Sequence, residues 1–151
     1  MSLKEYEKKR NLEKSGEPKA VVKKDSKKLI FIVHEHHASH LHWDLRLEMD
    51  GVLKSWAVPK EPPEKQGIKR LAVQVEDHPF DYAKFHGTIP EGNYGAGKVE
   101  IWDNGTYEIK FSDSKKIELI FHGKKLKGHY ALIKTNYGSK PDKSWLFFKL
   151  D

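Results

Sequence analysis

The chain has no cysteine among its 151 residues. Disulfide bonds and thiolate metal sites are therefore excluded, which fits a reducing compartment, and we expect a cytoplasmic location. The sequence also lacks any apolar run of the roughly 18 to 20 residues that a transmembrane helix needs, and its N-terminus lacks an apolar signal segment. We therefore expect a soluble protein with no membrane partner.

Acidic residues are too few to balance the basic ones. The 28 lysine and arginine residues outnumber the 22 acidic residues and give a formal net charge of +6. Such an excess favours a polyanionic partner, although a lysine-rich solubilising surface would produce the same balance. The length fits one monomeric domain with a core of its own, and no internal repeat is visible.

The first 28 residues are mostly charged and contain few large apolar side chains. Their pattern predicts a short helix over residues 3–14, which Gly16 and Pro18 end, and then a loose basic arm. Such an arm is either disordered or able to reach over a nucleic-acid substrate. We therefore divide the chain into an arm over residues 1–28, partly helical or flexible, and a β-rich domain over residues 29–151.

Beyond the arm, short apolar or alternating segments are separated by clusters of Gly, Asn, Ser and Pro. Asp50-Gly51 is a hairpin turn signal, and residues 103–105 predict a second hairpin turn. Seven to nine short strands with little helix predict a mainly β protein, a small antiparallel barrel that is closed or nearly closed. The expected strands cover residues 29–33, 41–49, 52–58, 70–76, 98–102, 106–111, 116–121, 128–134 and 144–150.

Histidines crowd into one short stretch. Five of the nine histidines lie within residues 34–42, a density that indicates cation binding or proton transfer. From Leu41 to Met49, apolar and polar residues alternate strictly, which predicts a strand. Because successive side chains of a strand point to opposite faces, His42, Asp44 and Arg46 should form one polar row.

This polar row has the composition of a metal site. An imidazole and a carboxylate two residues apart can bind one divalent metal, and His36 could supply a third ligand. Spacing favours His36 only weakly over the other upstream histidines, because a bend at Ala38-Ser39 would break the parity. The row could equally be a solvated strand face, with Arg46 in a cross-strand salt bridge instead of at an anion.

Three further features lie downstream. His78 falls at a strand end, where functional side chains are often presented, although an exposed loop histidine would look the same. Tyr82 is most simply a core aromatic residue with a polar tip. Residues 89–97 contain three glycines spaced Gly-x-x-Gly-x-Gly, which is neither a dinucleotide fingerprint nor a P-loop. We expect a tight loop there that bends beside the site.

Two long blocks resemble a known family. The segments HASHLHWDLRLEMDGVLKSWAVPKEPP and RLAVQVEDHPFDYAKFHGTIPEGNYGAG closely resemble the 3'-phosphoesterase module of bacterial DNA ligase D and its stand-alone relatives. The likeness extends from about Phe31 to the C-terminal segments GHYALIKT and SWLFFK. It implies a small, manganese-dependent barrel that trims DNA 3' ends during end joining. The family removes a terminal ribonucleoside to leave a 3'-phosphate, and then removes that phosphate.

The resemblance also implies roles for individual residues in the barrel. The family's metal ligands match His36, His42 and Asp44. Its essential phosphate-contacting side chains match Arg46, His78 and Tyr82. Its supporting positions match Lys60, Arg70 and Glu76.

The arm carries a weaker part of the resemblance. Arg10 and Glu17 match two family positions that act on the substrate, within Lys9-Arg10-Asn11 and Glu17-Pro18. Asn11 replaces the family's aspartate, which leaves open what the arm contributes to ribonucleotide removal.

The implied substrates are 3' ends of DNA or of DNA/RNA primer-templates. A DNA ligase, a primase-polymerase and an end-binding protein would act in trans, because the sequence carries no such module. Two other functions stay open. One is a non-haem iron oxygenase whose triad adds His86, His122 or His129 to the His-x-Asp pair. The other is a non-catalytic module that binds nucleic-acid 3' ends and holds a structural metal.

Overall fold

The structure is a computed structural model that describes residues 3–10, 15–18, 28–136, 138 and 140–151. Within these residues it is mainly β, and none of their helices is long and apolar enough to cross a membrane. The helices are α1 (Lys4–Lys8) and the 3-10 helix η1 (Phe80–Lys84). The strands are β1 (Leu29–His37), β2 (Leu41–Met49), β3 (Val52–Val58), β4 (Lys69–Pro79), β5 (Gly87–Ile89), β6 (Gly97–Ser112), β7 (Lys116–His122), β8 (Lys127–Lys134) and β9 (Ser144–Lys149).

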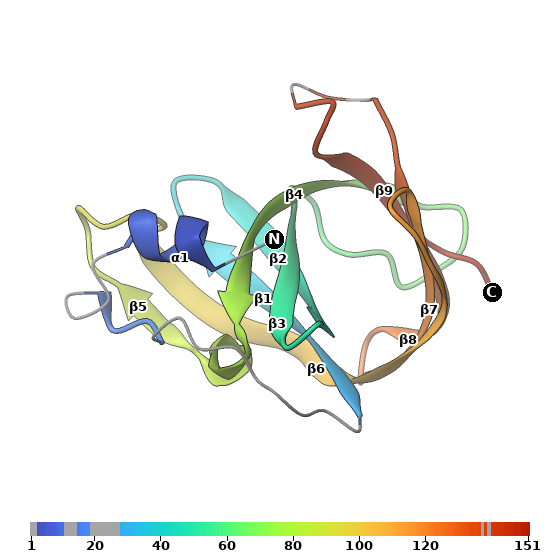
Figure 1. The fold of residues 1–151 in the computed structure, drawn as a ribbon, viewed down its shortest axis with the longest axis horizontal. Helices are drawn as coiled ribbons and strands as arrows, with labels where there is room; N and C mark the ends of the chain where they lie inside the picture. The colour runs from blue at the N-terminus through green and yellow to red at the C-terminus, as the bar shows by residue number, and fades with distance from the viewer. Residues whose placement is uncertain (1–2, 11–14, 19–27, 137, 139) are drawn as a thin grey trace.

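The strands close into a barrel. Neighbouring strands pair in the order β1-β2-β3-β4-β9-β8-β7-β6, and β6 pairs in turn with β1. All of these pairings are antiparallel, and β5 adds to β6 outside the closed ring (Figure 1). The prediction of a small, mainly β antiparallel barrel is therefore confirmed.

The Asp50-Gly51 turn joins β2 to β3 as the sequence predicts. Met49 pairs with Val52, which leaves two residues in the turn. Both have positive φ, 54° at Asp50 and 80° at Gly51. A two-residue turn of this kind matches the right-handed twist of the flanking strands, and Asp-Gly favours it. The turn therefore sets the register in which β2 presents its polar row beside β3.

The second predicted hairpin is wrong, because residues 103–105 lie inside the single long strand β6. The first part of β6 pairs with β1, and the later part pairs with β7. Gly105 serves close packing there, since a Cβ at this position would lie 2.3 Å from the carbonyl oxygen of His122. The glycine that suggested a turn is therefore present because β6 passes close to His122.

Asp103, the first residue of this predicted turn, is buried in β6 and binds several backbone N–H groups. Its carboxylate accepts backbone N–H groups from Asn104, Lys124, Lys125 and Leu126, at 2.8 to 3.0 Å. It therefore ties the loop between β7 and β8 to the middle of β6. A side chain that often stabilises its own turn therefore holds the β7–β8 loop in place.

Replacing Asp103 with alanine should cost about 3 kcal/mol of unfolding free energy, because buried N–H donors would lose their acceptor. The matched control is Asp113→Ala, which removes an exposed carboxylate that accepts the N–H groups of Lys115 and Lys116. Water can replace that acceptor, so the control should cost about 1 kcal/mol or less. Urea unfolding of both variants measures the difference, and equal losses would refute the role given to Asp103.

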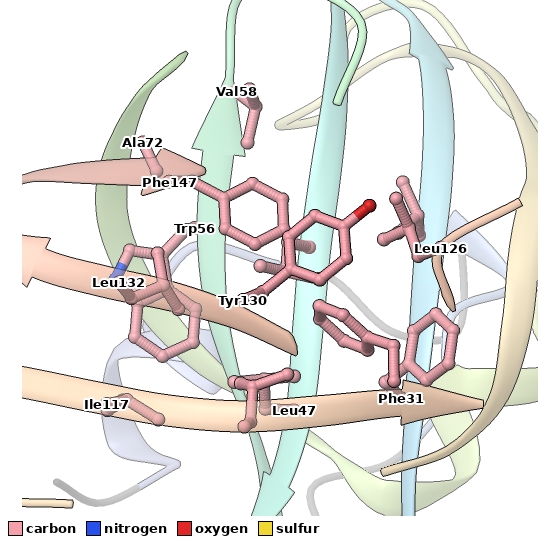
Figure 2. Close-up of a cluster of buried hydrophobic side chains, with 14 of the residues drawn as sticks. Phe31, Leu47, Trp56, Val58, Ala72, Ile117, Leu126, Tyr130, Leu132 and Phe147 are labelled. Carbon is pink, nitrogen blue, oxygen red and sulfur yellow. The ribbon is translucent and has the colours of Figure 1, made fainter. Parts of the chain in front are cut away.

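The apolar side chains of the described residues form two clusters on opposite faces of β1. Figure 2 shows the larger cluster, in which Phe31 packs with residues such as Trp56, Tyr130 and Phe147 in the barrel interior. Ile32, one residue further along β1, belongs instead to the smaller cluster with Tyr6 of α1 and with Tyr82 and Ala83 of η1. The face of β1 that points away from the barrel interior is therefore also buried.

The described parts of the arm cover this outer face. Tyr6 is fully buried, and its hydroxyl donates a hydrogen bond of 2.6 Å to the carbonyl oxygen of Pro18. The helix predicted over residues 3–14 is present as α1 over Lys4–Lys8. Residues 11–14, with Asn11, and the basic segment 19–27 lie outside the described residues. The polar row of β2 thus lies beneath a cover instead of on a solvated strand face.

Candidate metal and phosphate site

A cavity of about 280 Å³ lies above the polar row of β2. Its walls come from strands β1 to β6, from η1, from the arm, and from the glycine-rich loop of residues 90–96. Eight of the predicted site residues line it: Arg10, His36, His42, Asp44, Arg46, Glu76, His78 and Tyr82. The fold therefore gathers residues from distant parts of the sequence around one space.

Three of these residues converge as metal ligands would. One ligand atom from each of His36, His42 and Asp44 lies within 4.8 Å of the other two. Asp44 Oδ2 is 3.6 Å from His36 Nδ1 and 3.2 Å from His42 Nε2. His36 and His42 are cross-strand partners on β1 and β2, which explains why the two rings meet.

The other nitrogen of each ring faces a backbone carbonyl. His36 Nε2 donates to the oxygen of Gly95 at 2.7 Å, and His42 Nδ1 donates to the oxygen of His40 at 3.1 Å. When the two rings are neutral, these bonds leave His36 Nδ1 and His42 Nε2 with lone pairs directed toward the carboxylate of Asp44. Three acceptors that face one another need a cation between them, and metal-bound histidines are commonly oriented by such outer hydrogen bonds. The residues therefore fit a divalent metal.

Asp44 is ready to act as an anionic ligand. Burial would raise the pKa of its carboxyl, but the positive charge of Arg46 and the rings of His36 and His42, which donate to the carboxylate whenever those nitrogens carry a proton, outweigh burial. The pKa of Asp44 consequently lies well below its usual range. The carboxylate therefore keeps its negative charge at neutral pH.

Arg46 lies beside the cluster and is held on two sides. Its Nε donates to His34 Nδ1 at 3.0 Å, and its Nη1 donates to Ser55 Oγ at 2.8 Å. Its Nη2 lies 3.5 Å from Asp44 Oδ2. Arg46 is only 3% exposed. Its guanidinium lies over the ring of Tyr82, with Cζ 4.8 Å from the ring centroid. The fork is thus pre-oriented, with one edge toward the cluster and the cavity.

His34 supports Arg46 and does not join the metal cluster. Its Nε2 donates to the carbonyl oxygen of Phe85 at 2.9 Å, which leaves Nδ1 as the acceptor for Arg46. Burial, followed by the charge of Arg46, lowers the pKa of His34 to about 3. His34 is therefore a neutral positioning residue. Its place on the same strand face as His36 was the only signal of this role in the sequence.

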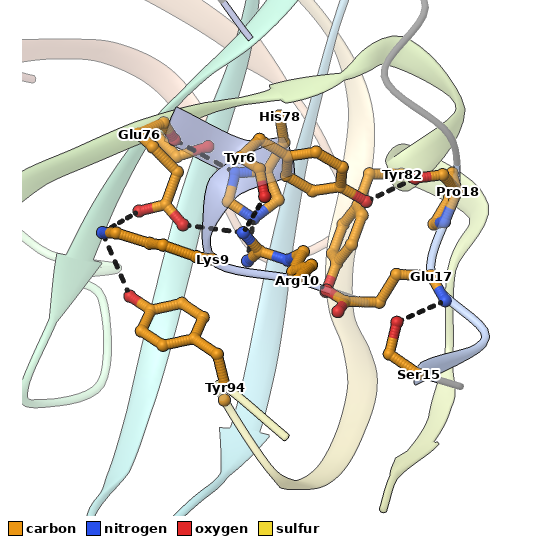
Figure 3. A network of polar contacts seen from close by, with 12 residues as sticks. Tyr6, Lys9, Arg10, Ser15, Glu17, Pro18, Glu76, His78, Tyr82 and Tyr94 are labelled. Atoms are coloured by element: carbon orange, nitrogen blue, oxygen red, sulfur yellow. Dashed lines mark hydrogen bonds and ion pairs between the residues drawn. The ribbon is translucent and has the colours of Figure 1, made fainter. Parts of the chain in front are cut away.

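Arg10 of the arm lines the cavity, and Figure 3 shows its contacts with the barrel residues. Its Nε donates to Glu17 at 2.8 Å, and its Nη1 donates to Glu76 at 2.9 Å. Its Nη2 lies 3.2 Å from His78 Nε2. Burial would raise the pKa of Glu76, but its bonds with Arg10 and with Lys9 hold it below the usual range. Arm and barrel are therefore joined by ion pairs at the edge of the site.

His78 and Tyr82 are both engaged by neighbours. The Nδ1 of His78 donates to the backbone oxygen of Glu76 at 3.0 Å, which leaves Nε2 as the acceptor for Arg10. Burial and the charges of Arg46 and Arg10 hold the pKa of His78 well below its usual range. The hydroxyl of Tyr82 donates to Glu17 Oε2 at 2.7 Å. A direct phosphate contact by either side chain requires these partners to change.

Two supporting residues lie elsewhere in the structure. Neither Lys60 nor Arg70 is among the described residues that line the cavity. Lys60 is exposed on the loop after β3. Arg70 donates through Nε to the backbone oxygen of Glu61 at 2.8 Å. The roles implied for these two residues remain predictions.

The histidines suggested for an iron triad do not join the cluster. His122 pairs with Glu108 at 2.6 Å, and His129 lies 3.5 Å from Glu118, all on the β6–β8 part of the sheet. His86 lines a different surface hollow beside β6. Among the described residues, the group that could hold a metal with His42 and Asp44 is completed by His36 on the adjacent strand.

A second group of possible ligands is partly exposed and already paired. Glu35, His37 and Glu100 also place ligand atoms within 4.8 Å of one another. His37 Nε2 lies 2.8 Å from Glu35, and Lys98 lies 2.7 Å from Glu100. These ion pairs account for the group without a metal.

The glycine-rich loop forms a tight loop beside the site, as the sequence predicts. Residues 90–96 form consecutive turns beside the cavity, and Gly95 supplies the acceptor for His36. The positions of Ser55 and Tyr94 in the site carried no recognisable signal, because each depends on strand pairing or loop placement.

The fold and the site define a small antiparallel β-barrel protein whose two histidines and one aspartate converge beside a buried arginine. The chain belongs to the DNA Ligase D 3'-phosphoesterase domain family, whose model matches residues 34–134.

Curated relatives agree with this assignment. The chain is 46% identical over 154 residues to the multifunctional non-homologous end joining protein LigD of Pseudomonas aeruginosa, a match covering 97% of this chain and 18% of that protein. It is 53% identical over 110 residues to the LigD DNA repair protein of Mycobacterium tuberculosis, covering 70% of this chain and 14% of that protein. The chain therefore spans less than a fifth of the length of these relatives.

Proposed function

We propose that this protein is a metal-dependent phosphoesterase that heals DNA 3' ends in end joining. It removes a 3'-terminal ribonucleoside as a phosphodiesterase and a 3'-phosphate as a phosphomonoesterase. The observation that carries the proposal is the cluster of His36, His42 and Asp44 directly beside Arg46, in a cavity of a member of this family.

The ligand set supports manganese as the proposed cofactor. Imidazole nitrogens with one carboxylate oxygen suit a divalent transition metal, so other such ions could replace Mn²⁺. His36, His42 and Asp44 would hold it. When bound, the ion would act as a Lewis acid that neutralises charge on a phosphoryl oxygen.

The chain's own residues supply the remaining electrostatics. Arg46 would bind a second phosphoryl oxygen, and its fork is kept in place by His34 and Ser55. Pre-oriented donors are effective because they need no reorganisation during the reaction. Proton donation to the leaving oxygen by His78 would require Arg10 to release Nε2, since both nitrogens are engaged here.

The proposed substrates are 3' ends of DNA and of DNA/RNA primer-templates. The net charge of +6 and the two arginines at the cavity, whose side chains are largely buried, suit a polyanion. The relatives are named multifunctional non-homologous end joining proteins, and this chain spans less than a fifth of them. We therefore propose that a DNA ligase, a primase-polymerase and an end-binding protein work together with this protein in end joining.

The direct test incubates the protein and manganese with two labelled primer-templates, one ending in a single ribonucleotide and the other in a 3'-phosphate. Gels that resolve single nucleotides should show loss of the ribonucleoside from the first substrate, and release of phosphate from both. Binding of the ends without any product would instead identify a non-catalytic end-binding module. Unchanged substrates with folded, metal-loaded protein would end the enzymatic proposal.

A further inference from the structure

Tyr94 is a large aromatic side chain at the edge of the cavity. It lines the cavity, yet it is 47% exposed. It belongs to neither of the two hydrophobic clusters formed by the described residues. Packing within the protein therefore does not explain why an aromatic ring stands at this position.

The loop that carries Tyr94 is anchored to the candidate metal cluster. The next residue, Gly95, accepts the hydrogen bond of 2.7 Å from His36 Nε2. Gly97 approaches β1 so closely that a Cβ there would lie 2.1 Å from the carbonyl oxygen of His37. Within the loop, Asn93 and Ala96 close successive turns through backbone hydrogen bonds. The backbone on both sides of Tyr94 is thus held in place relative to the cluster.

Two cations of the arm lie against the Tyr94 ring. Lys9 Nζ is 5.0 Å and Arg10 Cζ is 5.1 Å from the ring centroid. Figure 3 shows Lys9 between Glu76 and the hydroxyl of Tyr94, which are 3.2 and 3.5 Å from its Nζ. An aromatic platform beside basic side chains is the combination that binds nucleic-acid strands without regard to sequence.

The size of the cavity indicates which part of a substrate reaches this ring. Pockets that enclose a drug-sized ligand measure about 300 Å³ and more. A cavity of about 280 Å³ suits a phosphate with its adjoining sugar and leaves a base outside. With the phosphate at the cluster and Arg46, that base would lie at the rim, where Tyr94 stands.

We infer that Tyr94 stacks on the base of the nucleoside whose 3' oxygen carries the phosphate bound in the cavity. The inference rests on the proposed function. It adds a residue that binds the nucleoside next to the phosphate and does not touch the reacting atoms. Stacking uses the π-face that every base has, so this contact should tolerate any base. Tyr94 would then position 3' ends without selecting their sequence.

The test is a double-mutant cycle between the ring and the base. The protein variants are Tyr94→Leu and Tyr94→Phe, and the substrates end in a 3'-phosphate on either a normal or an abasic nucleoside. Tyr94→Leu should raise KM about tenfold for the normal end, with kcat unchanged, and should leave the abasic end unaffected. Tyr94→Phe should match the wild type on both.

The matched control is Phe111→Leu, which changes another aromatic residue that is 47% exposed but does not line the cavity. Its KM should equal that of the wild type for both ends. If Tyr94→Leu raises KM equally for normal and abasic ends, Tyr94 acts through the loop and the inference is overturned.

A second measurement separates this inference from the proposed function. In EDTA, without turnover, 2-aminopurine at the terminal nucleoside of the 3'-phosphate substrate should be quenched by the wild type and Tyr94→Phe, but not by Tyr94→Leu. Such quenching without any hydrolysis in manganese would refute the proposed function and support stacking. Hydrolysis with equal quenching by all three proteins would refute stacking and leave the proposed function standing.

Discussion

Asp44→Asn should abolish both proposed hydrolytic reactions, with a loss of about a thousandfold or more in kcat, and should weaken manganese binding at least about tenfold. The substitution removes the negative charge on which His36 and His42 converge. It also leaves a side chain of nearly the same size, so the β2 strand should keep its packing. Isothermal titration with manganese and primer-template gels measure the two effects.

The control for Asp44→Asn is His37→Ala, one residue from His36 on the same strand. The side chain of His37 is 43% exposed and pairs with Glu35, so both manganese affinity and activity should stay at the wild-type level. His42→Ala should behave like Asp44→Asn because it removes a second ligand. Full activity in Asp44→Asn or His42→Ala, with unchanged thermal unfolding, would remove that residue from the proposed metal site.

Arg46→Lys should lower kcat about a hundred- to a thousandfold while manganese still binds. A lysine keeps the charge, but one ammonium group cannot reach His34, Ser55 and a phosphoryl oxygen in the directions that the guanidinium serves. Single-turnover kinetics on a 3'-phosphate end separate this effect from substrate binding. Circular dichroism would verify that the barrel remains folded.

Ser55→Ala provides a graded companion to Arg46→Lys. It removes one acceptor of the guanidinium and leaves the bond to His34, so we expect an intermediate loss of about tenfold in kcat. The order wild type, Ser55→Ala, Arg46→Lys would support a pre-oriented arginine. An active Arg46→Lys variant would show that charge alone suffices and that the fork has no special role.

Strand alternation made the polar row of β2 predictable. Period-two spacing from Leu41 to Met49 assigns His42, Asp44 and Arg46 to one face whatever the rest of the fold. The structure confirms this face, since all three line one cavity. The Asp50-Gly51 turn was predictable for a similar reason, because only a few residue pairs suit positive φ at both positions.

The third candidate ligand could be identified only from contacts between segments that are distant in the chain. His36 was one of several upstream histidines, and the bend at residues 38–40 hid its parity with β2. Antiparallel pairing of β1 with β2 brings His36 opposite His42 and His34 opposite Asp44. That register then separates His36, a candidate metal ligand, from His34, which binds Arg46, although both are histidines on one strand.

The turn predicted at residues 103–105 failed for a related reason. Asp-Asn-Gly favours a turn when only local conformation matters. Here the carboxylate of Asp103 binds the β7–β8 loop, and Gly105 allows β6 to pass close to His122. Contacts from a distant segment outweighed the local preference.

Chain-local chemistry was thus enough to identify the barrel class, the polar strand face and, with the family motifs, the set of candidate residues. Which histidine completes the cluster, how Arg46 is held, and why Tyr94 stands at the rim emerged from strand register and from the arm that covers β1. The physical reason is the distance along the chain over which each interaction acts. Alternation and turn conformation depend on neighbouring residues, whereas ligand convergence and burial require segments far apart in sequence to meet.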